Sequence, residues 1–183
     1  MRTAIFIERD GVLNLPKVEG QYQIAPRVVT DLAVNRAALE PLKRLKQAGF
    51  MLIGTTNQPG ISRGHISRRE IDLMHTILMK AFPLDEIVMC PHDDADRCPC
   101  RKPKPGLFRE AAFNSQLLLD HCFVISDKWQ DAKAAQNAGC TSLLIESPWN
   151  GSGHHDFIVP DLASAASKVL QLQHSNSFAL ANA

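Results

Sequence analysis

The sequence predicts one α/β domain built on a mainly parallel sheet with helices on both faces. Short apolar runs rich in Val, Ile and Phe alternate with segments of helical periodicity, and this alternation is typical of parallel sheets covered on both sides. The chain has 183 residues, enough for a sizeable core. A net charge of +1 gives no reason to expect a nucleic-acid or membrane partner.

Five strands are expected from the apolar runs. They are Ala4–Glu8, Phe50–Thr56, Glu86–Cys90, Phe123–Ser126 and Ser142–Ile145. Ligands of open parallel sheets bind beyond the carboxyl ends of the strands. Polar or acidic residues end three of these strands, in Glu8-Arg9-Asp10, Thr55-Thr56-Asn57 and Ser126-Asp127 with Asp131. A site is therefore expected at that edge of the sheet.

The helices are expected between and after the strands. The predicted segments are Asn35–Ala48, residues 68–82, Gly106–Asn114, Asp131–Ala138 and Asp161–Leu172. Before the second helix, Ser67 and Glu70 have the spacing of a capping box, and Ile66 and Ile71 that of a hydrophobic staple. The domain is expected to span residues 1–172, with 173–183 as a flexible tail.

Four motifs carry candidate chemistry, and each also has a purely structural interpretation. The acid pair of "ERDGVLN" (8–14) is either catalytic or solvated charge. "TTNQPGISRG" (55–64) presents groups that suit phosphate oxygens, or is a surface turn. "CRKPKPGL" (100–107) has two prolines that restrain the backbone around Lys102 and Lys104, or is simply a solvated basic loop. "ISDKWQDA" (125–132) places acids where they bind Mg²⁺ or favour a helix N-terminus.

Taken in order, the four motifs resemble those of the haloacid dehalogenase superfamily. "TNQPGISRG", "CPCRKPKPG" and the "DK" of "SDKWQD" are most similar to D-glycero-D-manno-heptose 1,7-bisphosphate phosphatases and to histidinol-phosphate phosphatases. The resemblance implies a Rossmann-like fold without a large cap domain. It also implies a Mg²⁺-dependent phosphomonoester hydrolase acting on a small phosphorylated sugar or on histidinol phosphate. The segment 13–30 is expected to form a flap beside the pocket.

The resemblance implies a role for each site residue. Glu8 occupies the position of the nucleophilic aspartate, and Asp10 that of the acid–base aspartate. The implied Mg²⁺ ligands are Glu8, the backbone carbonyl of Asp10, and Asp127. The implied substrate-binding residues are Thr56, Asn57, Arg101, Lys102 and Lys128. Lys102 matches the lysine that stabilises the phosphoryl charge, whereas the role of Asp131 stays open.

The metal loop, residues 90–100, reads "CPHDDADRCPC". Three thiolates and one imidazole, from Cys90, His92, Cys98 and Cys100, suit a closed tetrahedral Zn²⁺ site of structural type. The alternative is a loop with three free thiols and a surface histidine. Zinc would pin the loop and thereby fix the following Arg101 and Lys102 over the phosphate. The two other cysteines, Cys122 and Cys140, are expected to be small buried hydrophobes.

Glu8 is the main departure from the family pattern. Its side chain is one methylene longer than aspartate, about 1.5 Å in reach, and a misplacement of about 1 Å costs on the order of 100-fold in rate. Impaired turnover is therefore expected. Ser126 is a smaller departure, where the family usually has Gly.

Three hypotheses follow. The first is a working phosphatase with a glutamate nucleophile or a shifted site. The second is a lapsed phosphosugar-binding or regulatory protein, and the third is a phosphatase of another kind, such as a polynucleotide 3′-phosphatase. The metal loop and the near-neutral charge disfavour the third.

The remaining expectations concern location and the pocket mouth. The N-terminus lacks a signal-peptide pattern, and no apolar run approaches the roughly 20 residues that span a bilayer, so a cytoplasmic monomer with a small phosphorylated metabolite as partner is expected. Trp129 either lines the pocket mouth or packs in the core. The pair His154-His155 is expected in an exposed loop and not at a second metal.

Overall fold

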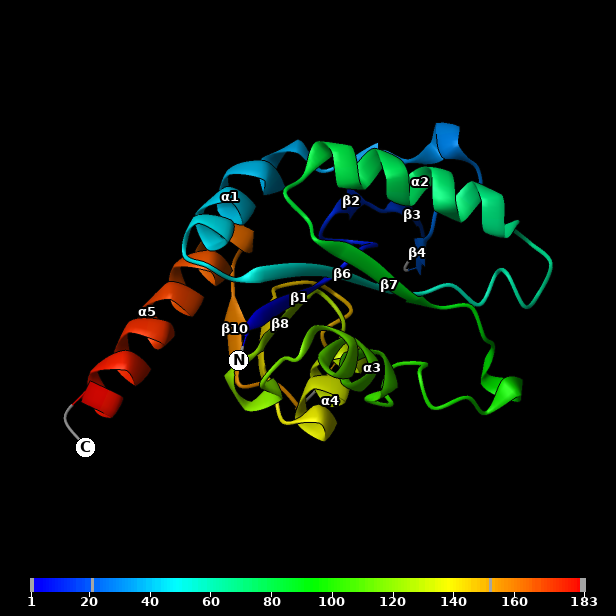
Figure 1. The fold of residues 1–183 in the computed structure, drawn as a ribbon. Coiled ribbons are helices and arrows are strands. Elements are labelled where there is room, and N and C mark those ends of the chain that lie inside the picture. Colours follow the sequence, from blue (N-terminus) through cyan, green and yellow to red (C-terminus); the bar gives the residue numbers. More distant parts are fainter. Residues whose placement is uncertain (1, 21, 152, 182–183) are drawn as a thin grey trace.

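The computed structural model describes residues 2–20, 22–151 and 153–181, with side chains through His174. Its centre is a six-stranded parallel sheet in the order β10-β9-β8-β1-β6-β7 (Figure 1). The strands are β1 (Ala4–Glu8), β6 (Met51–Asn57), β7 (Glu86–Cys90), β8 (Phe123–Ser126), β9 (Thr141–Ile145) and β10 (Phe157–Val159). The five expected strands are confirmed, with bounds shifted by one residue in β6 and β9. The short β10 was not predicted.

Helices cover both faces of the sheet (Figure 1). One face carries α1 (Leu39–Gln47), α2 (Arg68–Ala81) and α5 (Leu162–Ala181), and the other carries α3 (Gly106–Ser115) and α4 (Trp129–Ala138). Short 3₁₀ turns are η1 (Val29–Asp31), η2 (Arg36–Ala38), η3 (Asp94–Asp96) and η4 (Leu119–His121). Among the described residues, no helix has the length and apolar character needed to cross a membrane.

The central strand β1 is buried on both sides because its residues alternate between two cores. Ile5 and Ile7 pack in the cluster beneath α1 and α5, whereas Ala4 and Phe6 pack in the cluster beneath α3 and α4. This burial holds the end of β1, and with it Glu8, in a fixed position at the sheet edge.

The start of α2 follows the expected capping signal in part. The Ser67 side chain accepts a hydrogen bond from the Glu70 backbone N–H at 3.2 Å. The Glu70 carboxylate accepts from the Val29 N–H at 2.8 Å, so it caps η1 and not its own helix. Ile66 and Ile71 share a small buried cluster, as the staple predicted.

Two helix bounds differ from the prediction by more than two residues, and the others agree to within two. The helix expected from Asn35 begins with the 3₁₀ turn η2, and α1 proper starts at Leu39. At the other end of the chain α5 continues to Ala181, past the expected end at Leu172. Residues 182–183 of the expected tail lie outside the described residues.

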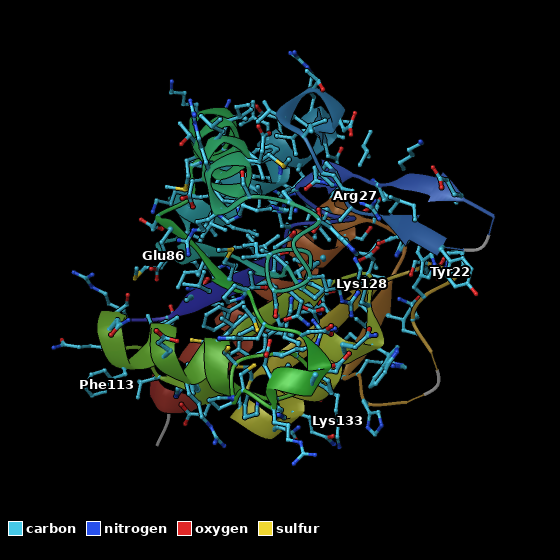
Figure 2. All side chains as sticks on the ribbon, turned by 90° about the vertical axis from the view of Figure 1, so that its right-hand side faces the viewer. Tyr22, Arg27, Glu86, Phe113, Lys128 and Lys133 are labelled. Carbon is cyan, nitrogen blue, oxygen red and sulfur yellow. The ribbon has the colours of Figure 1, made fainter. Side chains whose placement is uncertain are left out.

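The expected flap is a pair of small antiparallel ladders. Strand β2 (Asn14–Leu15) pairs with β5 (Ala33–Val34), and β3 (Lys17–Glu19) pairs with β4 (Tyr22–Ile24). The β3–β4 hairpin projects at the side of the molecule, with Tyr22 near its outer end and Lys128 closer to the centre (Figure 2). The hairpin therefore stands beside the carboxyl edge of the sheet without forming a separate domain.

Candidate active site

The carboxyl ends of β1, β6 and β8 meet at a cavity of about 560 Å³. Its polar lining includes most of the predicted site residues: Glu8, Asp10, Asn57, Arg101, Lys102, Lys128 and Asp131. They come from segments far apart in the sequence, and the parallel topology brings them to one edge. The convergence expected from the motifs is therefore present in the structure.

Lys102 is the centre of a buried charge triad. Its ammonium donates to Glu8 Oε2 and, at 2.5 Å, to Asp131 Oδ1. A longer contact of 3.3 Å joins it to Thr55 Oγ1. The side chains of the triad are at most 4% exposed, so the ion pairs are shielded from water.

The electrostatics of the triad follow from two carboxylates sharing one ammonium. Burial alone would lower the pKa of Lys102, but Asp131 and Glu8 outweigh it and raise that pKa above its ordinary value. Burial, followed by repulsion from Glu8, raises the pKa of Asp131 above its usual range. Asp131, whose role the sequence left open, is thus a full member of the site.

Asn57 positions Lys102 through its main chain. The Asn57 side-chain Nδ2 donates to the Lys102 carbonyl at 3.0 Å, and the Lys102 N–H donates to Asn57 Oδ1 at 3.1 Å. This two-bond clamp joins the end of β6 to the basic loop. The side-chain amide that the sequence suggested for phosphate binding therefore hydrogen-bonds the backbone of Lys102.

Asp10 accepts hydrogen bonds on both carboxylate oxygens. The donors are Arg9 at 3.0–3.2 Å, Asn14 and Thr56 at 3.2 Å, and Gln58 at 2.8 Å. Although burial opposes it, the charge of Arg9 leads the effects that lower the pKa of Asp10. The Thr56 hydroxyl is fully buried and lies on Asp10 and not at the cavity wall, so its placement differs from the phosphate contact that the sequence suggested.

Asp127 is held from two sides. Its Oδ1 accepts from Lys128 Nζ at 2.7 Å, and its Oδ2 accepts from Gln23 Nε2 of the β3–β4 hairpin at 2.6 Å. Gly11 permits this placement, because a Cβ on that residue would lie 2.2 Å from Asp127 Oδ2 and its φ is +111°. Gln23 was missed by sequence reasoning, because its link to Asp127 is a long-range contact.

The oxygens proposed for Mg²⁺ already converge on a cation. Lys128 Nζ, which lies near the middle of this face (Figure 2), donates both to the Asp10 carbonyl and to Asp127 Oδ1. The ammonium thus stands where a divalent ion would meet those oxygens. With the Glu8 carboxylate nearby, the donor set is all oxygen, which fits Mg²⁺.

The metal loop brings its four predicted ligands together. One ligand atom from each of Cys90, His92, Cys98 and Cys100 lies within 4.8 Å of the others. The contacts among them run from 3.3 to 3.6 Å. A tetrahedral Zn²⁺ with bonds of about 2.0–2.3 Å needs ligand separations of roughly 3.5–3.8 Å. Five of the six ligand pairs thus have separations near these values, and the sixth, His92–Cys98, lies within 4.8 Å, so the cluster is compatible with a zinc site.

The same loop is tied to the site through Arg101. The Arg101 guanidinium donates to the Asp94 carboxylate at 2.7 and 3.3 Å and to the His92 carbonyl at 3.4 Å. Asp93 of the loop pairs with Arg63 at 2.6 Å. The loop thus fixes Arg101 at the cavity wall, although Asp94, which the sequence did not single out, already pairs with its charge.

Cys122, Cys140 and His154 lie where the sequence predicted, whereas His155 is half-buried. Cys122 and Cys140 are buried, and burial raises the pKa of the Cys122 thiol to about 11, so both behave as small core residues. His154 lies on an exposed loop with φ +68°. Among the described residues, the metal loop is the one group of three or more Cys, His, Asp or Glu side chains whose ligand atoms lie close enough together to share an ion.

Comparison with known proteins agrees with this architecture. The HAD-hydrolase-like family profile matches residues 99–165. The D,D-heptose 1,7-bisphosphate phosphatase of Bordetella bronchiseptica, whose crystal structure contains magnesium and phosphate, superposes with a TM-score of 0.78 at 29% identity. That match covers 93% of this chain and 99% of the other. The fold and the strand-end site thus define a haloacid dehalogenase-like phosphatase.

Proteins of similar sequence identify a branch of the phosphatases to which the chain is similar. The D-glycero-β-D-manno-heptose-1,7-bisphosphate 7-phosphatase of Helicobacter pylori is 34% identical over 79% of this chain and 85% of its own length. The protein of that name from Pseudomonas aeruginosa is 30% identical over 93% and 99%. The bifunctional HisB protein of Legionella pneumophila is 30% identical over 79% of this chain and 42% of its own length. The chain therefore belongs to the haloacid dehalogenase-like phosphatase family that includes these heptose bisphosphate phosphatases and HisB.

Proposed function

We propose that this chain is a Mg²⁺-dependent phosphomonoester hydrolase whose turnover is limited by Glu8. The observation that carries the proposal is the Glu8–Lys102–Asp131 triad at the cavity. The Asp10 carbonyl and Asp127 Oδ1 meet at Lys128, which lines the same cavity. A negative nucleophile, a buried cation and an oxygen-rich cation site are what phosphoryl transfer needs, because its catalysis is mostly positioning and charge neutralisation.

The chain's own groups define the reaction. An oxygen of Glu8 forms a bond to phosphorus while the ester P–O bond breaks, and the leaving oxygen takes a proton from Asp10. Water then attacks the phosphoryl–Glu8 adduct and gives its proton to Asp10, which releases phosphate and restores Glu8. Mg²⁺, held by Glu8, the Asp10 carbonyl and Asp127, would neutralise the phosphoryl charge. The lowered pKa of Asp10 keeps it ionised at neutral pH, so protonation of Asp10 has to accompany substrate binding.

The position and the hydrogen bonds of the Glu8 carboxylate support the expectation of slow turnover. Strand β1 pairs in regular register with β6 as far as Glu8 opposite Thr55, so no bulge withdraws the longer side chain. Its Oε1 accepts from the Asp10 N–H at 3.3 Å while Oε2 lies on Lys102. The carboxylate is thus held by protein groups at both oxygens, which restricts the movement by which it would approach phosphorus.

The alternative function is a lapsed phosphosugar-binding or regulatory protein on the same fold. The engagement of Glu8 with Lys102 favours it, because a binding protein needs the cation and the phosphate pocket but no mobile nucleophile. The two candidates differ in one observable: Mg²⁺-dependent release of phosphate from a bound ester.

The substrate class follows from the relatives, which are named for heptose bisphosphate and for histidine biosynthesis. We propose a small phosphorylated sugar or histidinol phosphate. A panel of heptose 1,7-bisphosphate, histidinol phosphate and a chromogenic ester, assayed with and without Mg²⁺, tests both parts. Phosphate release that requires Mg²⁺ supports the hydrolase. Ester-dependent thermal stabilisation without release in native chain and in Glu8→Asp supports the binding protein.

A further inference from the structure

A second cleft of about 430 Å³ adjoins the catalytic cavity. Gln23, Lys128, Trp129 and Gln130 line both spaces, so the two share a wall. The residues that belong to the second space alone include Tyr22, Pro148 and Trp149. A group bonded to a phosphate in the first cavity can therefore extend directly into the second. We call this second space the aromatic cleft.

The aromatic cleft is lined by every Trp and Tyr residue of the chain. The whole chain has two Trp and one Tyr, and all three line this cleft from three separate segments: β4, the start of α4 and the loop after β9. Tyr22 is 66% and Trp129 39% exposed. Large aromatic side chains held open to solvent at a concave surface mark a binding surface. Of the two positions considered for Trp129, the pocket mouth is the one observed.

The loop that carries Trp149 is anchored to the catalytic edge. Ser147 Oγ and Asn150 Nδ2 both donate to the Asp127 carbonyl, at 2.6 and 3.1 Å. Gly151, at φ +65°, lies against Trp129, since a Cβ there would come within 3.2 Å of the tryptophan Cβ. The aromatic wall is thus fixed relative to Asp127 and the phosphate site.

The charges around the cleft restrict what it can hold. Among the described lining residues none is Asp or Glu, and the one cation, Lys128, directs its ammonium to Asp127 and the Asp10 carbonyl. Two glutamine amides supply neutral hydrogen-bonding groups. Beyond Lys128 the lining offers no charged partner to a charged substituent of a ligand, whereas an uncharged ring would find aromatic faces and amide edges, so the cleft suits the ring of a leaving group and not its charged substituents.

We propose that the aromatic cleft binds the leaving group of the phosphomonoester, and that this leaving group carries an uncharged ring with an apolar face. The inference rests on the proposed function, because the ring is placed by a phosphate in the adjoining cavity. A sugar ring and a planar aromatic ring share this chemistry. Stacking between rings is worth about a fivefold to tenfold gain in affinity per contact.

The test measures binding by calorimetry in Mg²⁺, with Asp10→Asn as the background if the native chain hydrolyses the ligands. Mannose 1-phosphate and phenyl phosphate represent the two ring types, and glycerol 1-phosphate and inorganic phosphate are the ring-free controls. We expect Tyr22→Ala and Trp129→Ala each to weaken ring-bearing ligands about fivefold to tenfold and to leave ring-free ligands unchanged. Quenching of tryptophan fluorescence by mannose 1-phosphate should accompany binding.

Phe113→Ala is the matched control, because Phe113 is 86% exposed and lies on α3, away from Tyr22 (Figure 2); it should change none of the affinities. Ring-bearing and ring-free phosphates of equal affinity, or cleft variants that weaken both alike, would overturn the inference and leave the proposed function intact. Absence of binding by every phosphate would overturn both. Preference between mannose 1-phosphate and phenyl phosphate identifies the ring type.

Discussion

Shortening Glu8 by one methylene tests how the site limits turnover. Glu8→Asp withdraws the carboxylate by about 1.5 Å, away from Lys102 and toward the reach that the family's aspartate has. A nucleophile displaced by about 1 Å loses on the order of 100-fold in rate, equivalent to about 2.7 kcal/mol in the barrier. We therefore expect Glu8→Asp to raise kcat/KM at least 100-fold.

The assay is Mg²⁺-dependent phosphate release from the ester panel, with thermal unfolding to verify the fold of each variant. Glu110→Asp on the exposed side of α3 controls for the substitution itself, and Glu8→Gln should abolish any native turnover because the nucleophilic charge is removed. The reasoning is refuted if Glu8→Asp is folded and no faster than a native chain that turns over readily. Such a result would mean that the longer side chain is correctly placed in this site.

Three further predictions concern the metal loop, a close approach and a buried histidine. Protein purified without chelator should contain about one zinc per chain by elemental analysis; Cys100→Ser should lose it while Cys140→Ala keeps it, and equal zinc in both variants would contradict the site. Gly11→Ala should lower the free energy of unfolding in urea by at least about 2 kcal/mol more than Gly20→Ala does. Both glycines have a positive φ, but an added Cβ would clash with Asp127 at Gly11 and would meet nothing within 4 Å at Gly20. Similar losses in the two variants would argue against the contact. Burial and then the charge of Arg9 lower the pKa of His75 from 6.5 to about 4. Between these two pH values His75 is protonated in the unfolded chain and neutral in the folded chain. The free energy of unfolding therefore falls as the pH drops through this range. His75 should account for about 2 kcal/mol of the loss between pH 7.5 and 5, which His75→Gln removes and His154→Gln, on an exposed loop, does not.

Local signals in the sequence were sufficient for much of the fold. β1 is an uninterrupted apolar run because it is buried on both faces, and Ser67 marks the start of α2 because its side chain caps Glu70. β10 escaped prediction because three residues are too few to show a period. The end of α5 was misplaced because residues after Leu172 lack an apolar stripe, although the helix continues to Ala181.

The site shows the same division between local and long-range information. The metal ligands and the residues at strand ends could be identified because their chemistry follows their spacing. Their partners could not, since Gln23 reaches Asp127 and Gln58 reaches Asp10 across the fold. Nor could the sequence show that Thr56 hydrogen-bonds Asp10, or that Asn57 hydrogen-bonds the backbone of Lys102. Such contacts depend on tertiary packing and not on local pattern.

The central claim is that Glu8, the Asp10 carbonyl and Asp127 form one cation site against a phosphate held by Lys102. Crystals grown with Mn²⁺ and phosphate, measured for anomalous scattering, test it most directly. We predict a manganese peak among those three oxygen groups, with Lys128 moved off the Asp10 carbonyl and phosphate between the metal and Lys102. A metal peak elsewhere, with Lys128 still on Asp10 and Asp127, would contradict the account.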